Sequence, residues 1–146
     1  MILEEFRRIV TEAKQRNPIW FALQTERPAT DAEIQQAEWQ LRTSLPEEYK
    51  EFVKEFGGGY FAFANVFSVA SGGDWNIVDR NRKENLIGSG YVAISDPNTG
   101  DLYGFKSEDK RCRSQIMVLD HDSGEWHATR YQDLFEFLAS TALKGE

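Results

Sequence analysis

Two turn sequences in the second half of the chain, each set between β-rich segments, most strongly limit the fold available to it. Residues 91–95 (YVAIS) and 101–105 (DLYGF) flank the turn sequence DPNTG, and a second pair, IMVLDH and EWHATR, flanks DSG. Aspartate, asparagine, proline and glycine are the residues that tight turns favour. Each pair therefore predicts a β-hairpin, and hairpins that follow one another along a chain favour an antiparallel sheet.

Segments with helical spacing of apolar residues surround these hairpins. The first covers residues 2–16, and the second begins at a capping box formed by Thr30 and Glu33 and runs to about Arg42. A third helix follows Pro46, and YQDLFEFLASTAL closes the chain as a helix. We therefore predict one α+β domain over all 146 residues: a mostly antiparallel sheet of consecutive hairpins, flanked by N-terminal helices and a C-terminal helix.

Three consecutive glycines, Gly57 to Gly59, follow the third helix. At the C-terminal end of a helix the dipole is negative and bare carbonyls face outward, whereas a phosphate-binding loop uses the free N–H groups of a helix N-terminus. We therefore interpret the glycines as a helix stop, with Gly57 or Gly58 in the left-handed conformation. No lysine–serine or lysine–threonine pair follows them, so the nucleotide-binding P-loop pattern is absent.

The segments between these elements carry weaker signals. Residues 60–69 are aromatic and apolar, which predicts a strand whose buried face carries Phe61, Phe63, Phe67 and Val69. The segment WNIVDRNRKENL is weakly helical, and the connector IWFALQTERPA after the first helix is expected to be extended and partly buried.

Charge and hydrophobicity limit the classes of partner. With 17 Lys and Arg against 24 Asp and Glu, the net charge is −7 at pH 7. This charge argues against direct binding to nucleic acid, which requires a cationic surface, and it fits a basic partner or simply high solubility. No stretch approaches the roughly 20 apolar residues that cross a bilayer. The N-terminal MILEEFRRIV is unlike a secretory signal, so we expect a cytoplasmic protein with no membrane partner.

Catalytic chemistry has little support in the sequence. Cys112 is the single cysteine; its cationic neighbours in KRCRSQ can lower the pKa of the thiol, but no histidine is near it, so we prefer an ordinary free thiol. Nucleophile-elbow, zinc-helix and dinucleotide-binding motifs are absent. We therefore predict that the protein is not an enzyme and uses no cofactor.

One cluster of potential metal ligands occurs at the second turn. The ligands are Asp120, His121, Asp122, Glu125 and His127. A metal-dependent hydrolase would need both imidazoles to converge with a carboxylate, which depends on the hairpin register. Aspartates are ordinary turn residues, so no metal site is predicted.

From Pro28 onward the chain resembles the SUKH superfamily, the Smi/Knr-like proteins. In PATDAEIQQAEWQLRTSLPEEYKEFVKEFGGGYF, a capped helix bearing E-I and a later glutamate precedes an L-P-x-x-Y-x-x-F helix that ends in glycines. GYVAISDPNTGDLYGF and IMVLDHDSGEWHATRYQDLFEFL are similar to the hairpins and closing helix of the family. The similarity covers about residues 28–140. Residues on the pattern include Glu33, Ile34, Glu38, Leu41, Leu45, Pro46, Tyr49, Phe52, Gly57, Gly58, Gly100 and Asp101.

The resemblance implies an α+β fold in which helices pack around a mostly antiparallel sheet. It also implies a binding role, because many bacterial members look like immunity proteins that neutralise polymorphic toxins, often nucleases, by direct contact. Eukaryotic relatives act in cell-wall regulation as interaction proteins. The family is not associated with a set of catalytic residues. Val53, where leucine is common, and RYQDLF before the last helix depart from the pattern.

We therefore predict an immunity protein (antitoxin) whose partner is a cognate toxin, with a basic nuclease domain as the expected target. Carboxylates would steer such a partner and aromatic rings would anchor it. For Trp75 and Trp126, packing in the core is the competing interpretation. The predicted partner-binding residues are Asp74, Trp75, Asp101, Tyr103, Asp120, Asp122, Glu125 and Trp126.

The alternative function is a non-catalytic regulatory or scaffold module that binds a peptide or a small ligand. Its binding pocket would lie under the sheet. The residues expected to line that pocket are Phe61, Phe63, Phe67 and Tyr91.

Overall fold

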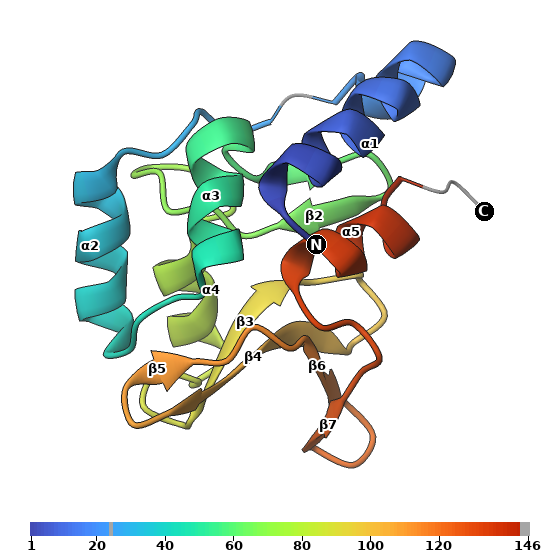
Figure 1. Cartoon of the computed structure of the whole chain (residues 1–146). Coiled ribbons are helices and arrows are strands. Elements are labelled where there is room, and N and C mark those ends of the chain that lie inside the picture. The colour runs from blue at the N-terminus through green and yellow to red at the C-terminus, as the bar shows by residue number, and fades with distance from the viewer. Residues whose placement is uncertain (24, 144–146) are drawn as a thin grey trace.

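The structure, a computed structural model, describes residues 1–23 and 25–143 and has the predicted α+β fold. Figure 1 shows the helices gathered above an antiparallel sheet, which forms the lower part of the molecule. The helices are α1 (Leu3–Arg16), the 3-10 helix η1 (Pro18–Phe21), α2 (Asp31–Leu41), α3 (Glu47–Phe56), α4 (Ile77–Lys83) and α5 (Leu134–Thr141). Within the described ranges, no helix is long and apolar enough to cross a membrane.

The main sheet is built from the two predicted hairpins, and both are confirmed. Its strand order is β3-β4-β6-β7, with every neighbouring pair antiparallel. The short strand β5 pairs with the C-terminal end of β4. A separate two-stranded sheet pairs β1 with β2. The strands are β1 (Gly59–Phe61), β2 (Ala64–Val66), β3 (Tyr91–Ser95), β4 (Leu102–Glu108), β5 (Arg111–Cys112), β6 (Met117–Asp120) and β7 (Glu125–Ala128).

The predicted capping box at the start of α2 is confirmed. The Thr30 hydroxyl accepts from the Glu33 backbone N–H at 3.2 Å, and the Glu33 carboxylate accepts from the Thr30 N–H at 3.1 Å. Glu33 also accepts from the Ser71 N–H at 3.2 Å, and its hydrogen bond from Arg27 lowers its pKa to about 2. One glutamate therefore fixes the helix start and ties it to a distant loop. The helix ends at Arg42, whose φ of 63° is left-handed.

The helix stop after α3 is also confirmed. Pro46 is the residue that precedes the first turn, and Gly57 ends the helix with a φ of 83°. An added Cβ on Gly57 would lie 2.0 Å from the Glu26 backbone oxygen, so no side chain fits there. The glycines thus let the connector from η1 to α2 pass against the end of α3.

Two local predictions were wrong. Instead of the one strand predicted over residues 60–69, residues 59–66 form a tight hairpin, β1–β2, that reverses at Ala62 (φ 50°). The reversal leaves Phe63 56% exposed while Phe61 and Phe67 are buried. The connector after α1 contains η1 and is not simply extended; within it Ile19 is 80% exposed.

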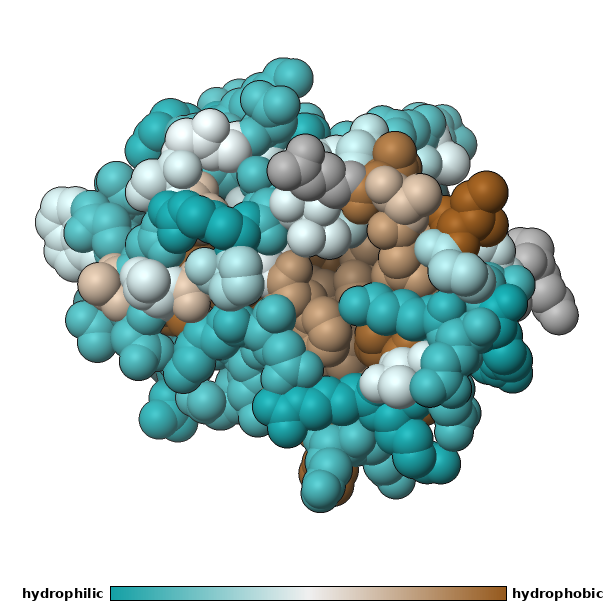
Figure 2. Space-filling view, turned by 90° about the horizontal axis from the view of Figure 1, so that it is seen from above, coloured by the Kyte–Doolittle hydropathy of each residue, from teal (hydrophilic) through white to brown (hydrophobic). Residues whose placement is uncertain are grey.

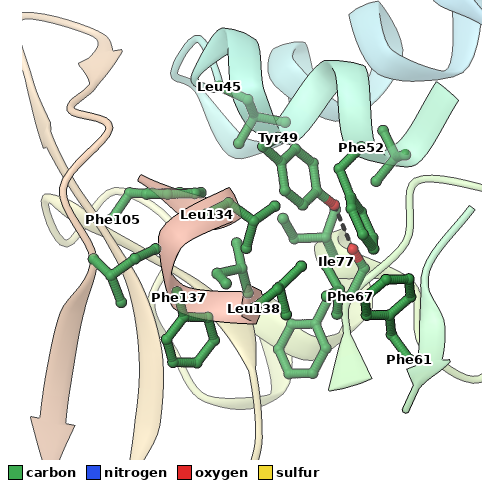
Figure 3. Close-up of a cluster of buried hydrophobic side chains, with 14 of the residues drawn as sticks. Leu45, Tyr49, Phe52, Phe61, Phe67, Ile77, Phe105, Leu134, Phe137 and Leu138 are labelled. Atoms are coloured by element: carbon green, nitrogen blue, oxygen red, sulfur yellow. Dashed lines mark hydrogen bonds between the residues drawn. The ribbon is translucent and has the colours of Figure 1, made fainter. Parts of the chain in front are cut away.

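The core lies between the helices and the sheet. It takes buried side chains from α1 to α5 and from both sheets. Figure 3 shows Tyr49 and Phe52 of α3 among aromatic and aliphatic side chains from the rest of the chain. The dashed line there is the hydrogen bond that the fully buried Tyr49 hydroxyl donates to the Phe67 backbone oxygen. Burial raises the pKa of Tyr49, so this donor stays protonated.

Candidate partner-binding surface

Acidic side chains gather where the β3–β4 turn meets the β6–β7 turn. Asp101 accepts a hydrogen bond from the His121 backbone N–H at 3.0 Å, and its Oδ1 lies 2.6 Å from the His121 Nδ1. Asp122 Oδ1 lies 3.3 Å from the His121 Nε2. One ligand atom each of Asp101, Asp120 and His121 lies within 4.8 Å of the other two. Glu125 is paired with Asp120 across the hairpin and is exposed. Five residues therefore form what we call the acidic end: Asp101, Asp120, His121, Asp122 and Glu125.

His121 was not among the predicted partner-binding residues, yet it organises this surface. Its pKa is raised by the hydrogen bond to Asp101 and by the charge of Asp122. The pKa of Asp101 is lowered by the hydrogen bonds from the His121 backbone and ring. An added Cβ on Gly100 would lie 2.9 Å from the His121 ring, so the glycine leaves room for the imidazole. The glycine–aspartate pair of the first hairpin thus positions the turn of the second.

A metal-dependent hydrolase is not supported by the hairpin register. Ligand atoms of Asp101, Asp120 and His121 come within 4.8 Å of one another. His127 instead lies opposite Val118 on the neighbouring strand and, among the described residues, is not in that group. The two imidazoles do not converge. Mutual hydrogen bonding of Asp101 and His121 explains their proximity.

Trp126 lies on the other face of the sheet from the neighbouring acidic side chains. In β6 and β7, Leu119 pairs with Trp126 and Asp120 pairs with Glu125, and successive residues of a strand point to opposite faces. The Trp126 ring stacks on Tyr91, with the ring centres 4.7 Å apart and the planes 1° from parallel. Both rings are half-buried, so the structure separates this predicted residue from the acidic end.

Tyr103 faces a groove next to the acidic end. Its ring centre lies 4.8 Å from that of Phe137, and both rings line a groove of about 350 Å³. Pro97 and Asn98, in the turn that leads to Asp101, line the same groove. The predicted residues Asp101 and Tyr103 therefore belong to adjoining parts of one surface.

Trp75 reaches the same groove only indirectly. Its half-buried ring packs against Tyr60, with centres 5.2 Å apart, and lies under the Arg80 guanidinium at 4.7 Å. Tyr60 lines the groove, whereas Asp74 is exposed beside Trp75 and its backbone oxygen accepts from Arg80 at 3.2 Å. Trp75 is thus partly a packing residue, and Asp74 neither lines the groove nor belongs to the acidic end.

A set of exposed apolar side chains was not predicted from the sequence, and one of them, Phe63, was expected on a buried face. Ile19 and Leu23 are 80% and 58% exposed, and Tyr60 and Phe63 are 43% and 56% exposed. Leu23 and Tyr60 line both the groove described above and a larger one of about 540 Å³. Figure 2 shows hydrophobic surface in a hollow on the upper face, bordered by hydrophilic side chains. The apolar run PIWFAL directly after a helix-ending asparagine was the available sequence signal.

The alternative pocket does not form as predicted. Phe61 and Phe63 line two different grooves, and Phe67 is buried in the core. Tyr91 stacks on Trp126 on the outer face of the sheet. The reason is the β1–β2 turn, which sends neighbouring aromatic side chains in different directions.

The cations beside Cys112 in the sequence do not lower the pKa of its thiol. Burial raises the pKa of the Cys112 thiol to about 11, and the thiol lies 3.8 Å from the Thr43 hydroxyl. Such a thiol is almost entirely protonated at neutral pH and is a poor nucleophile.

A comparison with protein-family models decides the family. The model described as SUKH_6, SMI1-KNR4 cell-wall, matches residues 31–138. The chain belongs to the SUKH superfamily. A search of curated proteins gives no significant match. The SUKH match runs from the start of α2 into α5, so it includes the acidic end but not α1 or η1, which supply one wall of the larger groove.

Proposed function

We propose that this SUKH protein is an immunity protein that binds a cognate toxin directly, and that the toxin is a basic nuclease domain. Membership of the superfamily supports a non-catalytic interaction module of the immunity type. The observation that carries the proposal is that the acidic end adjoins, through the β3–β4 turn, a groove bordered by exposed apolar side chains.

Each part of this surface has a physical role in binding. Nucleases hold phosphates with cationic side chains, so carboxylates on an inhibitor attract the same surface and raise the rate of association. Exposed rings and aliphatic side chains bury area on contact and slow dissociation. Asp101, Asp120, Asp122 and Glu125 would supply the first effect. Leu23, Tyr60, Phe63 and Tyr103 would supply the second. Asp74, Trp75 and Trp126 remain proposed contacts, with Trp126 on the other face of the sheet from the acidic end.

Neutralisation then requires no chemistry on the toxin. The bound SUKH protein would cover the cations that hold the nucleic acid and exclude the substrate by charge and by volume. Because exposed carboxylates are screened by salt, the association rate should fall as ionic strength rises.

The test is binding to the toxin domain encoded next to this gene, measured by biolayer interferometry at low and high salt. Asp120→Lys with Asp122→Lys should slow association at least about tenfold at low salt. Leu23→Ala with Phe63→Ala should mainly speed dissociation. The matched control is Glu12→Lys with Glu84→Lys, which makes the same charge change at exposed carboxylates elsewhere. No binding at low salt, or an equal loss in the control, would contradict the proposal.

The larger groove supports the second candidate, a module that binds a peptide or a small ligand. Its volume of about 540 Å³ lies within the range of ligand pockets. Its walls include Trp20 and Phe56, but Lys14 and Glu55 also line it. If the toxin binds the protein equally well when this groove is open and when it is filled, the immunity proposal is the better one.

A further inference from the structure

The end of β4 that lies away from the acidic end carries positive charge. Arg42 follows α2, Lys110 lies at the turn between β4 and β5, and Arg111 is the first residue of β5. All three side chains are exposed, and none forms a salt bridge within the described part of the chain. Of the carboxylates nearby, Glu38 is occupied by Lys50 at 3.2 Å and by the Leu45 N–H at 2.7 Å. The exposed Asp109 precedes Lys110 in the β4–β5 turn, so among the described residues the three cations outnumber the one free carboxylate there.

An exposed tryptophan lies beside these cations. Trp39 of α2 is 76% exposed, which is unusual for so large an apolar side chain. It borders an open groove of about 480 Å³ that Arg42 and Lys110 also line. A neighbouring hollow of about 150 Å³ shares Arg42 and Lys110 and reaches Gly88. Arg42, Lys110 and the Trp39 ring therefore border a common space.

The backbone that carries these side chains is fixed. Ser44 N–H donates to the Lys110 oxygen at 3.0 Å, and Cys112 N–H donates to the Ser44 oxygen at 2.8 Å. The Thr43 and Ser107 hydroxyls are 2.6 Å apart, which joins the end of α2 to β4. A surface held in this way loses little backbone entropy when a partner binds.

We propose that this basic end, defined by Trp39, Arg42, Lys110 and Arg111, is a docking surface for an acidic segment of a protein partner. Unpaired cations on a protein of net charge −7 provide local complementarity to carboxylates. The indole provides area for an apolar side chain within that segment. A short acidic segment fits better than a nucleic acid, because a long polymer of phosphates would extend past the basic end onto the negatively charged remainder of the protein, which repels it. The surface is separate from the proposed toxin-binding one and does not depend on it.

The test uses a fluorescent synthetic peptide of alternating glutamate and glycine with one central leucine, and polarisation at low salt as the readout. The wild-type protein should bind it, and the same peptide with glutamine in place of glutamate should not bind. Arg42→Glu with Lys110→Glu should raise the Kd at least about tenfold, and Trp39→Ala should raise it about threefold or more. Arg8→Glu with Arg16→Glu, the matched control on the exposed side of α1, should change it less than about twofold.

Several outcomes would overturn the proposal. They are no binding to the wild-type protein, equal binding of the glutamine peptide, or an equal loss in the α1 control. Tighter binding of a short single-stranded RNA through Arg42 and Lys110 would assign the surface to nucleic acid instead. Self-association that Arg42→Glu with Lys110→Glu abolishes, without peptide binding, would make the surface an interface between copies of this chain. Circular dichroism and a thermal melt of each variant separate lost binding from lost folding.

Discussion

At one end of β4, Asp101 is engaged by His121 and lies beside further carboxylates, whereas at the other end Arg42 and Lys110 form no salt bridge within the described residues. Both ends have aromatic side chains next to the charges, Tyr103 at the first and Trp39 at the second. The net charge of −7 is a sum that hides this separation. Because a docking partner responds to the local potential, one acidic protein can offer one surface that attracts cationic partners and another that attracts anionic partners.

Strand β4 joins the acidic end to the basic end, so a change within this strand can disrupt both surfaces. Gly104 lies inside β4, and an added Cβ would be 2.1 Å from the Val92 backbone oxygen. Gly104→Ala should push β3 away from β4 and lower the free energy of unfolding by about 2–4 kcal/mol. Urea denaturation measures this. Gly124→Ala is the control, since no atom lies within 4 Å and only its φ of 72° costs about 1 kcal/mol. Equal losses would refute the packing argument.

Charge reversal should separate the two ends in binding to a basic toxin domain. Asp120→Lys with Asp122→Lys should lower the association rate at low salt at least about tenfold, since it removes the attraction. Arg42→Glu with Lys110→Glu should leave the rate unchanged or raise it by up to about threefold, because it removes repulsion. Stopped-flow fluorescence over a range of salt concentrations measures both. Similar slowing by both pairs would show that the ends are not distinct.

The helix that carries the basic end depends on its cap. Thr30→Ala removes the acceptor for the Glu33 N–H and should lower the free energy of unfolding by about 1 kcal/mol. Thr11→Ala, at an exposed position within α1, should change it by less than about 0.5 kcal/mol. Thermal unfolding compares the two variants. If Thr11→Ala were the more damaging, the capping box would not be the source of the effect.

The acidic end should respond to pH near neutrality, while the basic end contains only lysine and arginine as its cations. Because the pKa of His121 is raised, its contribution to stability is present below its unfolded value near 6.5 and is lost as pH rises through the folded value. Asp101, whose pKa is lowered, contributes above its unfolded value near 3.8 and loses that contribution as pH falls through the folded value. The pair is therefore most favourable in the window between these losses.

This smallest effect is measured by NMR titration of the His121 ring. Asp101→Asn removes the charged hydrogen-bond partner and should move the titration midpoint down toward 6.5. Glu125→Gln removes a nearby carboxylate that does not contact the ring and should leave the midpoint almost unchanged. A midpoint that Asp101→Asn does not alter would mean that the ring is held by other contacts.

Local chemistry explains why much of the fold was predictable. Turn residues between β-rich segments identified both hairpins, and Thr30 with Glu33 identified the start of α2 because its cap is formed within four residues. The β1–β2 turn was missed, since Ala62 adopts a positive φ without glycine, asparagine or proline to signal it. The conformation of this turn is set by the segments that pack against it, and a short stretch of sequence carries no information about them.

The candidate site was less predictable for the same reason. Aspartates in turns suggested the acidic end, and the structure brings Asp101, Asp120 and Asp122 around the His121 ring. The side to which Trp126 points depends on strand register, and the exposure of Ile19 depends on what packs beside η1. The positive charge around Arg42 was hidden because α2 and the β4–β5 turn are far apart in the sequence.

The protonated thiol of Cys112 has a practical consequence. It lies directly beneath the loop that presents Arg42, and it should react slowly with maleimides while the native contacts hold. As the chain contains a single cysteine, each molecule carries one built-in probe whose labelling rate reports how often that corner opens. A partner bound at the basic end should then change the labelling rate of Cys112, so binding can be followed on the unmodified protein.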